Sequence, residues 1–232
     1  IPHRRSVSII LTVRNDRKGC RLALDSLIAQ TRTPDEIVVL DAGSTDGTWE
    51  LLQKYASTIP YLRIVSVPGA NIAQGRNLAT TQATGEIIAA TDGGCSAEPK
   101  WLERIVRPFE EEPTTEFVAG AYRVSPHSLF ESVVGLATMR GQLDPVDERT
   151  FNPSARSMAY TKEVWRRAGG WPEWVRFSED TLFDLKMRKM GVNWKYAPTA
   201  IVHWRPRCTF NALARQFYHY GTGRGHTQIG AT

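Results

Sequence analysis

Two short segments of the chain end a run of apolar residues at an aspartate, and glycine-rich backbone follows at once. Residues 38–40 (Val-Val-Leu) lead to Asp41, and residues 87–91 (Ile-Ile-Ala-Ala-Thr) lead to Asp92, which Gly93 and Gly94 follow. Short apolar runs of this kind are typical of buried strands in a parallel sheet. Since loops at the carboxyl ends of such strands form the ligand crevice, we expect both carboxylates to face one crevice.

Two acidic strand ends in one crevice suit a nucleotide-sugar. Carboxylates accept hydrogen bonds from ribose hydroxyls and base N–H groups, and they ligate hard cations bound to a diphosphate. Asp41 is expected to accept from a base N–H. Arg76, at the start of a predicted helix, is expected to face the nucleotide, because arginine suits phosphates and planar bases. Thr12 and Arg14, at the end of the first predicted strand, are further candidates for the nucleotide site.

These residues require an alternation of strands and helices to position them. The apolar patterns predict strands at 7–13, 36–41, 62–67 and 86–91, with helices at 20–30, 48–55 and 72–84 between them. Such alternation implies right-handed crossovers and a mostly parallel sheet. The second half is less regular, and its predicted elements are a strand at 117–122, a helix at 129–141, a loop at 144–157, helices at 162–168 and 179–190, and short strands at 194–196 and 200–203.

Length and composition indicate one domain. A chain of 232 residues, 41% of them hydrophobic, can bury a full core. We expect one unit over 1–232, with a nucleotide-binding half at about 1–95, an acceptor-binding half at about 96–204, and a basic C-terminal helix and tail at 205–232. No apolar run approaches the roughly 18–20 residues of a membrane span, and no signal peptide is recognisable. Three distant cysteines without metal-binding spacing favour a reducing cytoplasm.

Positive charge is concentrated at the C-terminal end. Residues 185–232 carry a net charge of +8 and no acidic side chain, whereas the other 184 residues carry −3. This segment suits a diphosphate leaving group, an anionic acceptor or the anionic face of a membrane, and a solvated basic face is the plainer alternative. It includes an amphipathic helix predicted at 210–220, ending at Gly221, and a glycine-rich run that suggests a flexible lid. Candidate diphosphate contacts are Arg205, Arg207 and Arg224.

Several motifs in order resemble family 2 glycosyltransferases, over nearly the whole stretch from Ser6 to His203. The resemblance implies a GT-A fold, which is an α/β, Rossmann-like α/β/α sandwich with a mostly parallel central sheet. It also implies transfer of a sugar from a nucleoside-diphosphate sugar, UDP before GDP, to a hydroxyl of a sugar, a lipid-linked or a small-molecule acceptor. The motifs are Val7–Asn15, Asp41 with residues 43–48, residues 75–77, residues 85–86, residues 91–94, residues 169–171, Glu179-Asp180 and Val202-His203.

The resemblance also implies roles for individual residues. Asp180 would deprotonate the acceptor hydroxyl, and Glu179 would orient a neighbour or the acceptor. A single base without a second nucleophilic carboxylate is typical of direct displacement with inversion. First-turn carboxylates can also serve only the helix dipole.

The usual metal site of the family is altered here. Its Asp-x-Asp segment begins at Asp92, but Gly94 stands where the second aspartate would bind a divalent cation. Mg²⁺ or Mn²⁺ could instead be held by Asp92 with His203, whose position matches a metal-ligating histidine of some relatives. A structural role for this histidine is equally open. The basic segment could otherwise replace the metal in neutralising the diphosphate.

Two other functions stay open at this level. A binding module that has lost catalysis is favoured by Gly94 and disfavoured by the intact Glu179-Asp180 pair. A nucleotidyltransferase would need a glycine-rich loop after the first strand, and residues 12–16 contain no glycine. The basic segment has no recognisable nucleic-acid-reading motif, so a nucleic-acid partner is not expected. Peripheral contact with the inner face of the membrane through the basic segment is an open alternative to packing of the predicted C-terminal helix on the domain.

Overall fold

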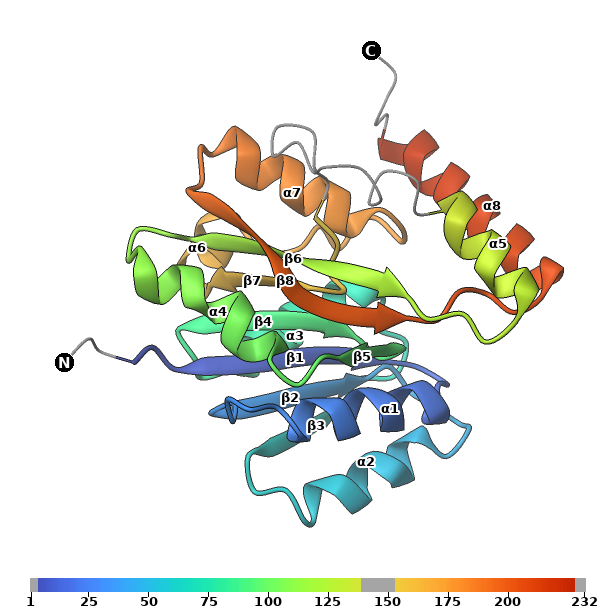
Figure 1. The fold of residues 1–232 in the computed structure, drawn as a ribbon, viewed down its shortest axis with the longest axis horizontal. Coiled ribbons are helices and arrows are strands. Elements are labelled where there is room, and N and C mark those ends of the chain that lie inside the picture. Colours follow the sequence, from blue (N-terminus) through green and yellow to red (C-terminus); the bar gives the residue numbers. More distant parts are fainter. Residues whose placement is uncertain (1–3, 139–152, 228–232) are drawn as a thin grey trace.

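One eight-stranded sheet runs through the molecule in the computed structural model, which describes residues 4–138 and 153–227 (Figure 1). Its strand order is β3-β2-β1-β4-β7-β6-β8-β5. The first four strands are parallel to one another, as predicted, and their buried apolar runs form the centre of the core. Their bounds are β1 (Val7–Val13), β2 (Glu36–Asp41), β3 (Leu62–Ser66) and β4 (Ile87–Asp92).

The second half of the sheet is mixed rather than parallel. β7 (Met158–Thr161) pairs antiparallel with both β4 and β6 (Phe117–Val124), and β6 pairs in parallel with β8 (Trp194–Trp204). The short β5 (Cys95–Ala97) lies antiparallel to β8 at the edge. The two short strands expected at 194–196 and 200–203 are therefore one strand, whose register against β6 shifts between Gly120 and Ala121.

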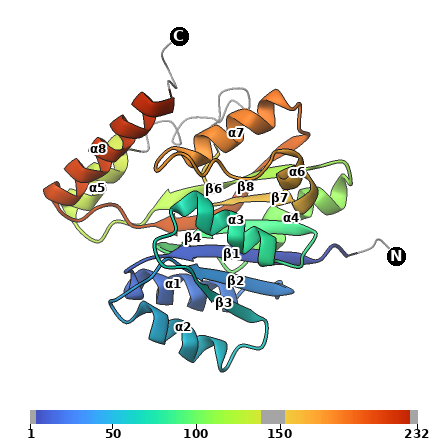
Figure 2. The same cartoon turned by 180° about the vertical axis from the view of Figure 1, so that it is seen from behind.

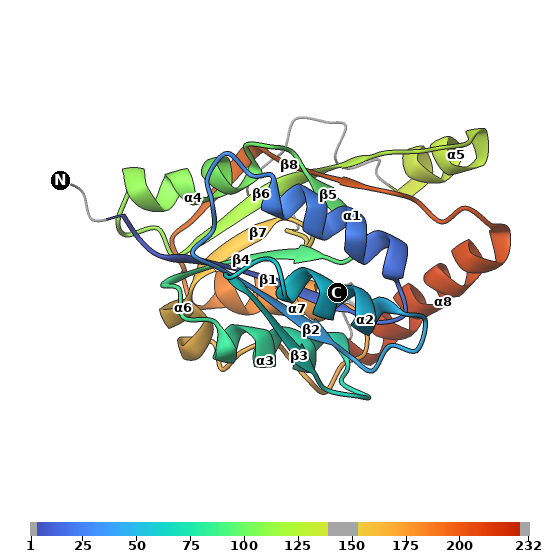
Figure 3. The same ribbon diagram turned by 90° about the horizontal axis from the view of Figure 1, so that it is seen from below.

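Helices cover both faces of the sheet and bury two apolar clusters against it (Figures 2 and 3). The α/β/α sandwich is thereby confirmed. The sequence analysis missed one helix, which contains a proline and follows the unpredicted β5. One face carries α1 (Arg17–Ile28), α2 (Thr48–Ala56) and α4 (Trp101–Glu111), and the other carries α3 (Ile72–Gln82), α6 (Lys162–Arg167) and α7 (Glu179–Lys189).

Two further helices, α5 (Leu129–Thr138) and α8 (Phe210–Thr227), lie at the end of the molecule opposite the N-terminus (Figures 1 and 2). α8 continues through Gly221, so the expected helix end and flexible glycine run are wrong. A Cβ at Gly223 would lie 2.9 Å from the Cβ of Phe177, so glycine permits the close packing of this helix. The rings of Phe177 and His219 stack at 4.3 Å. The end of the helix predicted at 129–141 and most of the loop at 144–157 fall outside the described residues.

No helix in the described ranges is both long and apolar enough to cross a bilayer.

Three aromatic rings fill the core beneath α7. Trp171 stacks on Phe183 with ring centroids 4.1 Å apart, and Tyr160 meets both rings edge-on. The indole N–H of Trp171 donates to the Tyr160 hydroxyl at 3.2 Å. This cluster fixes α7 on the sheet, and α7 carries the Glu179-Asp180 pair at its start.

Replacing Trp171 with alanine should lower the free energy of unfolding by about 3–5 kcal/mol, because it opens a cavity under α7. Trp174, three residues later, is 70% exposed, so Trp174→Ala should change stability by no more than about 0.5 kcal/mol. Urea unfolding followed by circular dichroism measures both. Equal effects of the two variants would contradict this account of the core.

Candidate functional site

The strand register brings the two acidic strand ends to either side of β1. Val13 lies opposite Asp41 of β2, and Thr12 lies opposite Asp92 of β4. A cavity of about 920 Å³ opens at this edge of the sheet. Thr12, Arg14 and Asp92 are on its wall, together with residues from α3, the start of α7 and α8. Residues far apart in the sequence therefore meet where the topology predicts a ligand crevice.

Asp41 is buried beside this cavity and is only partly satisfied. Its Oδ2 accepts hydrogen bonds from the backbone N–H groups of Gly43 and Ser44, at 3.0 and 2.9 Å. Its Oδ1 is buried and has no hydrogen-bond partner within the described residues. Asp41 itself is not among the residues that line the cavity, whereas the flanking residues Leu40 and Ala42 are. An unpartnered buried acceptor is costly, and it suits a ligand that brings an N–H donor.

Arg76 lies at the centre of the site and is 3% exposed. Its Nη2 donates to Asp92 Oδ1 at 2.8 Å, and its Nη1 donates to Glu179 Oε1 at 2.7 Å. The guanidinium carbon lies 4.8 Å from the ring centre of Trp171. The adjacent Gly75 lets α3 approach β1, since a Cβ there would be 3.0 Å from Thr12 Cγ2.

The charges of this triad are mutually stabilising. Burial opposes the charge of Arg76, but Asp92 and Glu179 outweigh burial and raise its pKa. Burial raises the pKa of Glu179, and Arg76 works against that rise. Arg76 was expected to face the nucleotide. It lines the cavity, yet both of its ion pairs are with the protein, so its first role in the structure is to join β4 to α7.

Asp180 occupies a different position from its neighbour Glu179. It lies in the first turn of α7, is partly buried and lines the cavity, and its Oδ1 accepts from the N–H of Thr181 at 2.9 Å. Ser178, just before the helix, has a φ of 67°. This left-handed turn directs the start of α7 into the site. Both carboxylates of the pair therefore line the cavity, but Glu179 is ion-paired with Arg76 and Asp180 has no ion pair within the described residues.

The residues after Asp92 do not make a conventional site for a divalent ion. Gly93 has a packing role, because a Cβ there would lie 2.7 Å from Val13 Cγ1. Gly94 offers no side-chain ligand, and Asp92 Oδ1 is already paired with Arg76. Among the described residues, no group of three or more His, Cys, Asp or Glu side chains could hold a metal. The donor set therefore does not fit the Mg²⁺ or Mn²⁺ that the motif resemblance implies.

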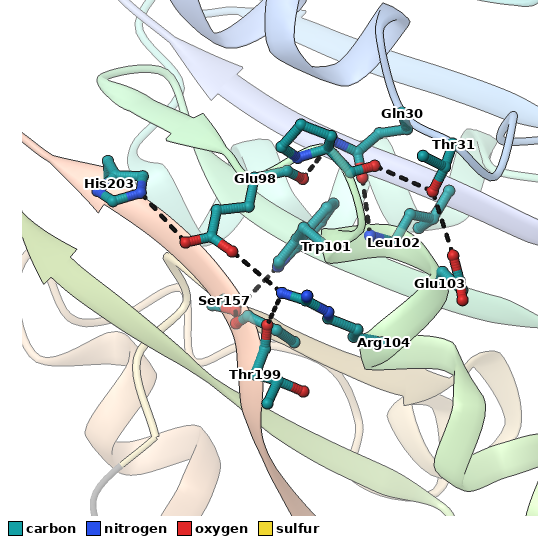
Figure 4. A network of polar contacts seen from close by, with 12 residues as sticks. Gln30, Thr31, Glu98, Trp101, Leu102, Glu103, Arg104, Ser157, Thr199 and His203 are labelled. Atoms are coloured by element: carbon teal, nitrogen blue, oxygen red, sulfur yellow. Dashed lines mark hydrogen bonds and ion pairs between the residues drawn. The ribbon is translucent and has the colours of Figure 1, made fainter.

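His203 is not brought to Asp92. Its Nε2 lies 3.4 Å from Glu98 Oε1, and Glu98 in turn accepts from Arg104 (Figure 4). The next residue, Trp204, lines the cavity instead. Because successive strand residues face opposite sides of a sheet, His203 points away from the site. His203 is therefore not positioned to bind a metal together with Asp92.

The three arginines proposed for the diphosphate are in different environments. Arg205 is bound through two nitrogens to Glu131 of α5, at 2.7 and 3.2 Å. Arg207 is exposed and lines the cavity. The side chain of Arg224 is outside the described part of the chain. Two further arginines line the wall, Arg156 and Arg176. Neither was predicted from the sequence, because both lie in segments where no helix or strand was expected.

The comparisons with known proteins agree with this arrangement. The sequence profile "Glycosyl transferase family 2" matches residues 8–162. The chain belongs to this family. The uncharacterized glycosyltransferase EpsJ of Bacillus subtilis is 26% identical over 77% of the chain and 55% of EpsJ. The chondroitin synthase of Pasteurella multocida is 32% identical over 80% of the chain and 19% of the synthase. This family 2 domain thus spans about half, or less, of these two relatives.

Solved structures place the family 2 domain in the GT-A class. The mannosyltransferase PcManGT of Pyrobaculum calidifontis, in complex with GDP-Man and Mn²⁺, superposes with a TM-score of 0.72 at 26% identity. The match covers 91% of the present chain and 60% of PcManGT. GalNAc-T7 superposes with a TM-score of 0.69 at 14% identity, over 88% of this chain and 44% of that protein, which shows the shared fold alone. The predicted GT-A fold is confirmed.

Replacing Arg76 with methionine should leave the buried carboxylate of Glu179 and the partly buried carboxylate of Asp92 unpaired, and should lower the free energy of unfolding by about 3–5 kcal/mol. The loss should depend on pH. The pKa of Glu179 is raised in the folded state, and removing Arg76 raises it further. The folded variant then binds protons that the unfolded chain releases, so its stability falls as pH rises above the ordinary carboxylate range.

Urea unfolding at pH 5 and pH 8 measures this dependence, and the loss should be smaller at pH 5. Adding Glu179→Gln to the Arg76→Met variant should recover part of the loss at pH 8. Arg176→Met, at an exposed arginine of the same cavity, is the matched control. A loss of the same size at both pH values would contradict the role of the buried carboxylates.

Proposed function

We propose that this domain transfers a sugar from a nucleoside-diphosphate sugar to an acceptor hydroxyl, with inversion at the anomeric carbon and Asp180 as the general base. The observation that carries the proposal is the position of Asp180 on the wall of the cavity into which the ends of β1 and β4 open. A base must reach both the acceptor hydroxyl and the donor carbon, and this wall faces the expected donor site.

The ion pairing of the three wall carboxylates supports the assignment of the base. Asp92, Glu179 and Asp180 line the cavity, but the first two are ion-paired to Arg76. Glu179 is therefore a positioning residue. With one free carboxylate on the described wall, the chemistry that fits is a single displacement, in which Asp180 takes the hydroxyl proton as the acceptor oxygen attacks. The bond between the sugar and the diphosphate breaks, and its electron pair leaves with the diphosphate.

For the donor, Asp41 is proposed to bind the base, with Thr12, Arg14 and the backbone at Gly93 framing the rest of the nucleotide. The motif resemblance favours UDP, and the GDP-Man bound by PcManGT supports GDP as the other carrier. PcManGT was solved with Mn²⁺, so Mg²⁺ or Mn²⁺ is the cofactor whose effect on nucleotide binding is to be measured against EDTA.

For the acceptor, we propose a sugar, lipid-linked or small-molecule hydroxyl and a place in polysaccharide synthesis, as the names of chondroitin synthase and hyaluronan synthase among the relatives suggest. Leu129 of α5 and Phe210 of α8 are 82% and 72% exposed, beside the basic C-terminal segment. These side chains support peripheral contact with the cytoplasmic face of a membrane.

The alternative is a domain that binds a nucleotide-sugar without catalysis. Gly94 favours it and the cavity position of Asp180 disfavours it. The two functions differ in whether Asp180 matters for turnover, because a binding module would not depend on a base.

Replacing Asp41 with asparagine should weaken nucleotide binding by about 10- to 100-fold. The amide oxygen can keep the hydrogen bonds from Gly43 and Ser44. The NH₂ group, however, takes the place of the unpartnered Oδ1, and as a donor it cannot accept a hydrogen bond from the base N–H. Calorimetric titration with UDP, GDP and dTDP, each with Mn²⁺, Mg²⁺ or EDTA, measures the change and any need for a metal. Unchanged binding would remove Asp41 from the site, and no binding by the wild type under any condition would overturn the donor assignment.

Replacing Asp180 with asparagine should lower turnover by about 10²- to 10⁴-fold while nucleotide affinity stays within about twofold of the wild type. Release of nucleoside diphosphate from the donor sugar, with simple sugars as acceptors, is the measurement. Glu163→Gln on the exposed part of α6 is the control and should turn over normally. Equal turnover of Asp180→Asn and wild type would exclude this residue as the base.

A further inference from the structure

Arg156 is held in an aromatic clamp on the cavity wall. Its guanidinium carbon lies 5.2 Å from the ring centre of Tyr122 on β6 and 4.7 Å from that of Trp204 on β8. Tyr122, Arg156 and Trp204 all line the same cavity as Asp92 and Asp180. A guanidinium stacked on rings keeps its N–H donors in the ring plane free for an anion.

The backbone that carries Arg156 is a turn just before β7, and it is anchored to the sheet by the N–H of Gly120, which donates to the Ser157 carbonyl at 2.8 Å. The flanking residues Ala155 and Ser157 are fully buried. The Ser157 hydroxyl donates to the carbonyl of Ala200 at 3.0 Å and accepts from the indole N–H of Trp101 at 2.9 Å, a contact drawn in Figure 4. Arg156 itself donates from Nη1 to Ser154 Oγ at 3.1 Å. The side chain is therefore placed before any ligand arrives, so binding costs little ordering entropy.

Its charge is not neutralised by a neighbouring carboxylate. Arg76 has two ion pairs and Arg205 has one, whereas within the described ranges no carboxylate lies within 4.0 Å of the Arg156 guanidinium. Burial is the largest single influence on the pKa of Arg156 and lowers it, but nearby groups, Asp92 first among them, together outweigh burial and raise this pKa, so the guanidinium stays positive. A partly buried cation that lacks a protein anion is a site for an anionic ligand.

Beyond the end of β4, the chain lacks the carboxylate that would hold a metal. Gly94 is the position in question, and a Cβ built there would meet only Asp16 Oδ2, at 3.7 Å. The space for a larger side chain is present, but glycine brings no side-chain ligand into it. The negative charge of a departing diphosphate must still be offset by a group on this wall.

We infer that Arg156 binds the diphosphate of the donor and offsets its negative charge, in place of a cation held by a carboxylate at position 94. This inference rests on the proposed function, because it assumes a nucleoside-diphosphate donor. Arg156 thereby takes the role that the sequence had suggested for Arg205, Arg207 and Arg224.

The test compares ligands with and without phosphates. Calorimetric titrations with UDP and GDP, and with uridine and guanosine, are made in EDTA on the wild type, Arg156→Gln and Arg156→Lys. We expect Arg156→Gln to bind the diphosphate about 10- to 100-fold more weakly and the nucleoside unchanged, with Arg156→Lys between. Unchanged nucleoside binding also shows that the variants are folded. Arg123→Gln, at the exposed neighbour of Tyr122 on β6 and outside the cavity lining, should bind like the wild type.

A second arm introduces the missing carboxylate. Gly94→Asp combined with Arg156→Gln should regain diphosphate binding when Mn²⁺ is added and lose it again in EDTA. Diphosphate affinity of Arg156→Gln equal to that of the wild type would overturn the inference while leaving the donor assignment intact. Wild-type binding that vanishes in EDTA would also overturn it, because a metal would then carry the charge. Absence of any nucleotide binding by the wild type, with or without metal, would instead overturn the proposed function.

Discussion

The ion-paired triad of Arg76, Asp92 and Glu179 is the constraint on which the site depends. Burying a guanidinium costs several kcal/mol unless its donors are paired, and here one side chain, 3% exposed, binds a carboxylate from β4 and another from α7. Trp171 stacks beneath it and ties it to the aromatic core. The start of α7 is consequently fixed against the strand ends, and that position is what brings Asp180 to the cavity.

The same triad determines which charges the cavity offers to a ligand. Because Arg76 is ion-paired with Asp92 and Glu179, Asp180 is the one carboxylate of the wall that has no ion pair within the described residues. Arginines from other elements, without an ion pair among the described residues, are the cations of this wall, and Arg156 is the one stacked on two aromatic rings. One base and a positive wall are the combination that sugar transfer to a hydroxyl requires, since the proton must leave the acceptor while negative charge develops on the diphosphate.

Much of this arrangement could be predicted from sequence, and the failures have identifiable causes. The strands that end at Asp41 and Asp92 follow from local apolar runs, and parallel pairing then places both at one edge. Arg76 and Glu179 are 103 residues apart, so no local pattern reveals their pairing. His203 was expected near the site because its strand-end position matches a metal-ligating histidine of some relatives, but the two-residue period of a strand directs it to Glu98 instead. The glycines of α8 suggested a break, but close packing against Phe177 keeps the helix continuous.

Gly94 and Arg156 belong to the two parts of the sheet that the sequence analysis treated differently. The parallel part could be predicted from local apolar patterns. It positions the strand ends at Asp41 and Asp92, and Gly94, where a metal ligand is missing, follows the second of them. The mixed part, with β6, β7 and β8, could not be predicted from local patterns. Its strand pairing brings Tyr122 and Trp204 to Arg156. Glycine at position 94 contributes no carboxylate to the charge balance of the site, while Arg156 contributes a cation to the cavity wall. The charge balance of the cavity is therefore set across the sheet, by residues that no single motif contains.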